Sequence, residues 1–208
     1  MSKYHIPLLP GNYYHLFSRA VGNEKLFLSE ENYNYFLVKL KSHIVPVADL
    51  FAYSLLPNHF HLLARIKEDN ELAAYFELKK EKPFDAKIHS LPDFTMEQFS
   101  NCLNGYAKAF NNMYNRKGGL FIDYLKRSEA KVDNDITSFL FYIHKNAIHH
   151  GLAKKMGEWS HDSYNTIISK RPTTIKREEV IGWFGSVKQF IEFHDRHVEL
   201  KQVNIFDL

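Results

Sequence analysis

The fold of this chain can be read outward from residues 49–66, DLFAYSLLPNHFHLLARI. Two apolar runs, 49–56 and 59–66, stand on either side of Pro57-Asn58, a pair of residues typical of a tight turn. The stretch therefore predicts a β-hairpin.

Side chains alternate between the two faces of a strand, so the second half of the hairpin has two different faces. Phe60 and Leu62 point toward an apolar core, and His59, His61 and Arg65 share the other face. Two imidazoles at this spacing can bind one divalent metal if a third ligand comes from elsewhere. They can equally be two half-buried histidines on a polar sheet face, and the hairpin alone leaves both interpretations open.

Strand and helix patterns follow one another along the rest of the chain. Aromatic or apolar runs bounded by turn residues predict strands, and apolar residues three and four apart predict helices. Thr95 and Gln98 form a capping-box pattern where one helix should start. The predicted elements are a strand over 13–20, a helix over 30–44, one short helix over 70–80 within the charged loop 67–94, a helix over 95–115, an extended segment over 120–132, a helix over 136–150, and one or two short helices over 176–196.

This order of elements predicts an α+β fold. Two strand–helix–strand units with an intervening hairpin are typical of a ferredoxin-like (RRM-like) antiparallel sheet with helices packed on it. The pattern changes near the end of the chain. We therefore predict one domain over residues 1–168 and a small helical C-terminal appendage over 169–208.

Composition sets limits on the class of protein. With 208 residues, 45% hydrophobic and 25% charged, the chain has the make-up of a soluble globular protein and not of a disordered one. It has no apolar run of 18 residues and no apolar N-terminal signal, which predicts no membrane span and a cytoplasmic location. A single cysteine excludes a disulfide framework. The net charge of +3 is compatible with a nucleic-acid partner without pointing to one.

The predicted helix 136–150 carries the second group of chemically active side chains. Its apolar stripe faces the core, and Tyr142 lies on the flank of that stripe. Asn146 and His149 follow four and seven residues later, so the three side chains share one ridge. A tyrosine hydroxyl and an amide oxygen would then project together beside the packed face. A boundary tyrosine with its hydroxyl in water has the same pattern, and both interpretations are open.

Four segments taken in order resemble the HUH single-tyrosine transposases, and within them the group associated with repeated extragenic palindromes. The resemblance covers about residues 13–165, and its order and spacing are more specific than any single piece. The segments are YHLFSR at 14–19, LPNHFH at 56–61, YIHKNAIHHGL at 142–152 and WSHDSY at 159–164.

The resemblance implies an enzyme that cleaves and rejoins single-stranded, hairpin-containing DNA. It assigns the metal ligands to His59, His61 and Asn146, with Mg²⁺ or Mn²⁺ as the cofactor, and the nucleophile to Tyr142, which would form a 5′-phosphotyrosine intermediate. One departure is Ala147, where the family often has proline. Alanine favours continuation of the helix, so the chemistry should not suffer.

Basic residues near these segments are candidates for DNA contacts, since single strands are held in basic grooves. Solvated surface charge is the competing interpretation for each of them. The candidates are Arg19, Arg65, Arg116, Lys117, Lys126, Arg127, Lys131, His149 and His150.

Two other functions stay open at this stage. One is a catalytically inactive nucleic-acid-binding module of the same fold, and the other is a metal-dependent hydrolase that does not act on DNA. A hydrolase that uses a metal-bound water should survive Tyr142→Phe. The oligomeric state is also open, because by resemblance some relatives are dimers that exchange the tyrosine helix and others are monomers.

Overall fold

The computed structural model describes residues 6–122, 125–131 and 133–196, without the side chains of 133 and 134. Its centre is an antiparallel sheet in the order β2-β3-β1-β4. The strands are β1 (Tyr13–Arg19), β2 (Ala48–Leu56), β3 (His59–Ile66) and β4 (Lys126–Glu129). This strand order is that of a ferredoxin-like sheet, so the predicted α+β fold and the predicted hairpin, formed by β2 and β3, are confirmed.

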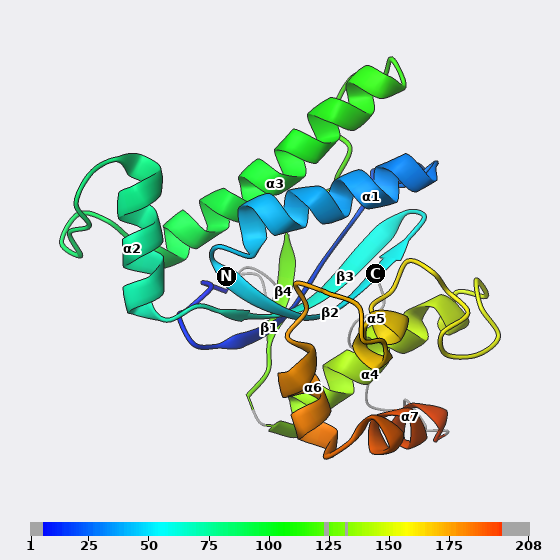
Figure 1. The fold of residues 1–208 in the computed structure, drawn as a ribbon. Helices are drawn as coiled ribbons and strands as arrows, with labels where there is room; N and C mark the ends of the chain where they lie inside the picture. Colours follow the sequence, from blue (N-terminus) through cyan, green and yellow to red (C-terminus); the bar gives the residue numbers. More distant parts are fainter. Residues whose placement is uncertain (1–5, 123–124, 132, 197–208) are drawn as a thin grey trace.

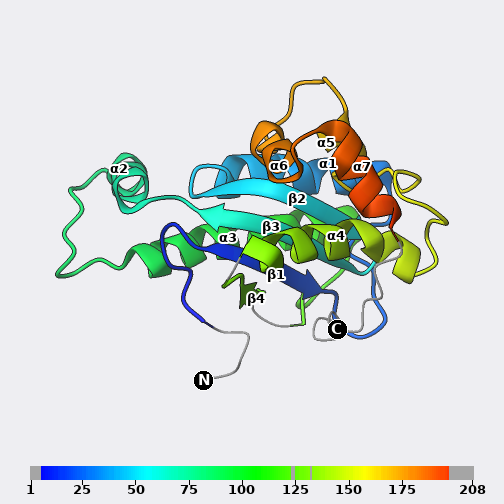
Figure 2. The ribbon, with the colours of Figure 1, turned by 90° about the horizontal axis from the view of Figure 1, so that it is seen from below.

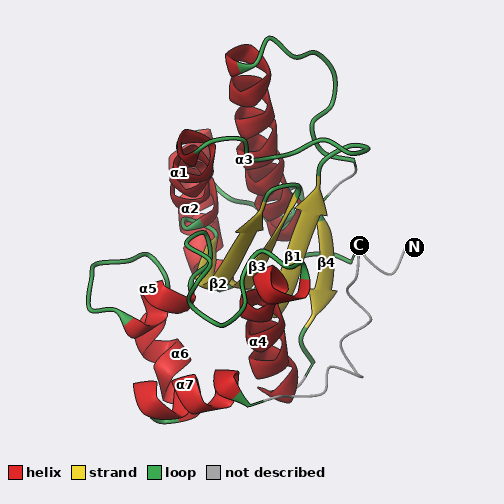
Figure 3. Cartoon of the chain, turned by 90° about the vertical axis from the view of Figure 1, so that its right-hand side faces the viewer, coloured by secondary structure: helices red, strands yellow, loops and turns green. Residues whose placement is uncertain are grey.

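Helices cover both faces of the sheet. Helices α1 and α3 lie on one face, with α2 at one end, and α4 lies on the opposite face (Figure 1). Three short helices, α5, α6 and α7, gather beside α4 (Figure 3). The bounds are α1 (Glu30–Lys39), the π-helical turn η1 (Leu40–Ile44), α2 (Asp69–Lys80), α3 (Leu91–Met113), α4 (Asp133–His149), α5 (Tyr164–Ile168), α6 (Arg177–Phe184) and α7 (Val187–Asp195).

The alternating pattern of β3 explains why two layers form on the sheet. Phe60 points toward α1, where its ring lies 5.0 Å from the ring of Phe36, and both side chains are buried. Leu63, on the opposite face, is buried like Leu140 and Ile143 of α4. Burying an apolar side chain of this size contributes about 1.5–3 kcal/mol. The sheet face that carries the histidines is therefore covered by α4, which forms a second packed layer (Figure 2).

Helix α3 begins earlier than the capping-box pattern predicted. Ser90 is its N-cap, and the Ser90 hydroxyl accepts a hydrogen bond of 3.3 Å from the backbone N–H of Asp93. Pro92 fits the first turn, where its missing N–H has no partner to lose. Thr95 lies fully buried inside the helix, so its prediction as the cap was wrong. Of the extended segment predicted over 120–132, residues 123, 124 and 132 lie outside the described residues, and the described part forms a named strand at β4 alone; α5 was not predicted.

The C-terminal helices are packed onto the rest of the fold. On α6, the Trp183 ring lies 4.9 Å from that of Phe51 and 6.2 Å from that of Tyr13. On α7, His194 is hydrogen-bonded to His144 of α4 at 3.0 Å. The predicted short helices over 176–196 are thus confirmed as α6 and α7, and they hold one end of the sheet and the outer side of α4.

Candidate active site

The predicted catalytic residues meet at one place, where α4 crosses the start of β3. Residues later along α4 lie beside residues earlier along β3. The ring of Tyr142 lies 5.5 Å from that of His61, and the ring of His150, two turns later, lies 4.7 Å from that of His59. Asn146 lies on the turn between them and is close enough to His59 to affect its pKa.

Both histidines of the pair are buried and held through the same ring nitrogen. Nδ1 of His59 is 2.7 Å from Oδ1 of Asn58. Nδ1 of His61 is 2.8 Å from Nε2 of His15, a fully buried residue of β1. These contacts hold each imidazole by one edge.

Burial keeps these imidazoles neutral. Desolvation lowers the pKa of His59 to about 4 and is its largest cause, followed by the charge of His150; the Asn146 amide acts in the other direction. Desolvation also lowers the pKa of His15 to about 3 and that of His61 well below its usual value. A neutral imidazole has a lone pair on one ring nitrogen, and this neutral form is the one that binds a metal.

Asn146 supplies an observation that fits a metal ligand. Its side chain is 1% exposed, and neither its amide oxygen nor its amide nitrogen forms a hydrogen bond of regular geometry. The amide nevertheless lies close enough to His59 to raise the pKa of that imidazole. A buried amide without partners is uncommon, because it costs about 1–3 kcal/mol. Two neutral imidazoles and an amide oxygen fit Mn²⁺, and Mg²⁺ less closely. Over the residues that the structure describes, no three His, Cys, Asp or Glu side chains form a metal cluster, so the amide would be needed.

The helix that carries Tyr142 is fixed from its other side as well. His144, two residues later, is fully buried and makes hydrogen bonds with the Ser163 hydroxyl at 2.8 Å and with His194 at 3.0 Å. The pKa of His144 lies well below its usual value because of burial. Tyr142 itself is 6% exposed, and its ring also lies edge-on to that of His15 at 5.7 Å. The tyrosine ring is thus oriented by contacts on both sides of the helix.

Several of the predicted DNA contacts lie beside this site. Arg19 is exposed at the end of β1, where it pairs in register with His59. Lys126 pairs in register with Phe17, which faces the same side of the sheet as His61. At the end of α4, His149 and His150 are exposed. Lys117 is exposed in the loop between α3 and Leu120. This loop is held near the end of β1, because the Leu120 carbonyl accepts a hydrogen bond from the backbone N–H of Val21.

The structure places four other candidates away from the site or in internal contacts. Arg65 forms ion pairs of 2.8 Å with both Asp49 of β2 and Glu179 of α6. Arg127 is buried on the opposite face, with its guanidinium on Met96 and on the Ile6 carbonyl. Arg116 pairs with Glu24 and holds the 118–119 loop. Lys131 follows β4 at the Tyr13 end of β1, away from the histidines.

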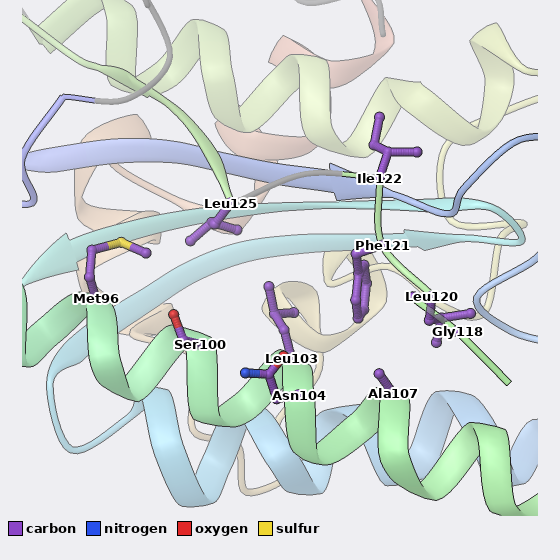
Figure 4. A pocket seen from close by; sticks show the side chains of 11 residues that line it. Met96, Ser100, Leu103, Asn104, Ala107, Gly118, Leu120, Phe121, Ile122 and Leu125 are labelled. Atoms are coloured by element: carbon purple, nitrogen blue, oxygen red, sulfur yellow. The ribbon is translucent and has the colours of Figure 1, made fainter. Parts of the chain in front are cut away.

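A separate cavity of about 500 Å³ lies on the other side of the sheet. It opens between α3 and the segment before β4, and Figure 4 shows Leu103, Phe121 and Leu125 pointing into it. The Ser100 hydroxyl and Asn104 amide add polar groups to a mostly apolar lining. The cavity carries none of the catalytic candidates, so it is not part of the site.

Comparison with known proteins defines the class of fold. No family model and no curated protein matches the chain. Among solved structures, the chain is similar to a REP-associated tyrosine transposase bound to a REP hairpin. The TM-score is 0.57 and the identity 12%, and the alignment covers 83% of this chain and 89% of that one. The chain therefore has the fold of that transposase, as the sequence resemblance implied.

Sequence reasoning missed the residues that hold the site in place. His15 lies in the segment YHLFSR but was assigned no role, although alternation along β1 puts it on one face with Phe17 and Arg19. Its contact with His61 depends on the β1–β3 register, which no local pattern reveals. Asn58 was assigned only to the turn, and His144 was not assigned a role.

Proposed function

We propose that this chain is an HUH-type tyrosine transposase that cleaves and rejoins single-stranded, hairpin-containing DNA. One observation carries the proposal: Tyr142 lies against His61, while Asn146, one turn later on the same ridge, is buried beside His59 without a hydrogen bond of regular geometry. A tyrosine, two neutral imidazoles and an unsatisfied amide on one packed interface suit phosphoryl transfer better than they suit a core. The fold, shared with a transposase that binds a hairpin, supports it.

The proposed ligands are His59, His61 and Asn146, and a bound Mg²⁺ or Mn²⁺ would supply Lewis-acid polarisation of the scissile phosphate. Tyr142 performs the covalent step. Its hydroxyl gives up its proton to solvent as the oxygen forms the bond to phosphorus. The bond from phosphorus to the 3′ oxygen breaks, and that oxygen takes up a proton and leaves as a 3′-hydroxyl. The 5′-phosphotyrosine link conserves the phosphodiester, so a 3′-hydroxyl can reverse the step without a nucleotide cofactor.

The DNA would lie across the end of β1 and the end of α4. Arg19, Lys126, His149 and His150 surround the site there, and Lys117 extends the basic surface outward. Arg65 and Arg127 are left out of this proposed surface because their guanidinium groups serve internal contacts. Within one chain, Tyr142, Asn146 and both histidines lie together, which supports a site formed in cis as part of this proposal. In the part of the chain that the structure covers, no helix has the length and apolarity to cross a membrane.

The test is formation of a covalent protein–DNA adduct. The protein would be incubated with Mn²⁺ or Mg²⁺ and labelled hairpin oligonucleotides from DNA flanking its gene, then run on a denaturing gel. Wild type should form an adduct, and Tyr142→Phe should not. Tyr13→Phe is the matched control, since Tyr13 lies on the same sheet face but under α6 and should leave the adduct unchanged. Metal-dependent cleavage that survives in Tyr142→Phe would instead identify a hydrolase, and hairpin binding without cleavage a non-catalytic module.

A further inference from the structure

The two histidines of the pair are held by different kinds of neighbour. The Asn58 side chain places its oxygen 2.7 Å from Nδ1 of His59. An amide oxygen only accepts hydrogen bonds, so the hydrogen of the neutral His59 ring is on Nδ1. The lone pair is then on Nε2, and that nitrogen is the one able to bind a metal.

His61 has another imidazole in the equivalent position. Nε2 of His15 lies 2.8 Å from Nδ1 of His61, and either nitrogen can be the donor. If His15 donates, the His61 hydrogen moves to Nε2 and that nitrogen cannot bind a metal. If His61 donates, its Nε2 keeps the lone pair, as in His59. Only the second arrangement gives the two rings the same ligating atom.

The surroundings of His15 fix its ring in place. The residue is fully buried in β1, and its ring stacks on those of His61, at 5.0 Å and 17°, and Phe17, at 4.9 Å and 21°. From α4, the Phe139 ring approaches to 5.4 Å. An apolar ring would fill this space without burying a polar group, so packing alone gives no reason for a histidine here.

We propose that His15 is a positioning residue that accepts the Nδ1–H of His61 and thereby holds Nε2 of His61 toward the metal. His15 does for His61 what Asn58 does for His59. The inference rests on the proposed function, because it assumes that His61 is a ligand. Residues that orient a ligating histidine in this way typically change metal affinity 10–100-fold when replaced.

The test measures Mn²⁺ binding without DNA and without turnover. Free Mn²⁺ would be titrated by electron paramagnetic resonance at pH 7.5 with wild type, His15→Phe and His15→Gln. We expect about 10–100-fold weaker binding for His15→Phe, which keeps a ring but has no acceptor. His15→Gln should recover most of the affinity, since its amide oxygen can accept the same hydrogen. Phe139→Leu, which removes a ring packed on His15, should lower the melting temperature and leave the affinity within about threefold.

A second measurement does not depend on how the variants fold. Nitrogen-15 NMR of metal-free wild type reports which ring nitrogen carries the hydrogen, and we expect Nδ1 for both His59 and His61. A hydrogen on Nε2 of His61, or wild-type Mn²⁺ affinity in folded His15→Phe, would overturn the role of His15 and leave the proposed function standing. Absence of Mn²⁺ binding in wild type would overturn both. Weakened binding in His15→Phe with no Tyr142 adduct in wild type would support the role of His15 and refute the transposase chemistry.

Discussion

Replacing Asn146 with leucine should make the metal-free protein more stable. The Asn146 side chain is 1% exposed, and neither of its amide atoms has a regular hydrogen bond. A buried polar group without partners costs about 1–3 kcal/mol, and leucine has a similar shape without that cost. For a chain of this size, each kcal/mol corresponds to about 2–4 °C in melting temperature. Most core substitutions destabilise a protein, so a gain is a demanding prediction.

The effect should reverse when metal is added. With Mn²⁺ at a hundredfold excess over its dissociation constant, the wild-type protein should gain about 2.7 kcal/mol. Asn146→Leu, with a ligand removed, should gain much less. Calorimetry should therefore give Asn146→Leu the higher melting temperature in EDTA and wild type the higher melting temperature in Mn²⁺.

The matched control is the same substitution at another buried asparagine. Asn32 is 4% exposed, and its amide oxygen accepts hydrogen bonds from the backbone of Leu28 and Ser29 and from the Tyr114 hydroxyl. Asn32→Leu should therefore lower the melting temperature in both buffers. If Asn146→Leu melted below wild type in EDTA, as Asn32→Leu should, the amide would have a structural role and the reasoning would be refuted.

Three further predictions address the histidines and the basic surface. Burial lowers the pKa of His194 from 6.5 to about 4, so the unfolded chain binds its proton first as the pH falls. This residue alone should therefore lower the free energy of unfolding by about 3 kcal/mol between pH 6.5 and 4. Urea unfolding across that range checks this, and His194→Leu should flatten the dependence; an unchanged slope would contradict it. Arg19→Ala should weaken hairpin binding and reduce the slope of log affinity against log salt by about 0.7, whereas Arg127→Ala should lower stability and leave the slope unchanged. Equal slopes for wild type and Arg19→Ala would remove Arg19 from the DNA surface. Replacing both His59 and His61 with alanine should abolish cleavage and leave much of the DNA binding, as a cleavage assay and a filter-binding assay would show; loss of binding in the folded variant would mean that the metal anchors DNA.

The sequence predicted those parts of the fold that depend on local periodicity. Strand alternation placed His59 and His61 on one face, and helical spacing put Asn146 one turn after Tyr142. Both predictions need only neighbouring residues. The same alternation also shows that Lys126 and Arg127, adjacent on β4, point to opposite faces, so they could not both line one groove.

Contacts between distant segments could not be predicted in this way. Glu179 lies 114 residues after Arg65 and holds its guanidinium, which removed a candidate DNA contact. His15 reaches His61 only through the β1–β3 register, across 46 residues. The start of α3 was missed for another reason. Two N-caps competed within a few residues, and Ser90 with Pro92 prevailed over Thr95.

The central claim is that Tyr142 attacks DNA and retains the 5′ phosphate. The direct measurement uses two versions of one hairpin oligonucleotide, labelled at the 3′ end or at the 5′ end, with wild-type protein and Mn²⁺. A 5′-phosphotyrosine keeps the strand downstream of the cut, so the 3′ label should travel with the protein on a denaturing gel, and peptide mapping should find the adduct on Tyr142. Transfer of the 5′ label, or an adduct mapped to another residue, would contradict the account.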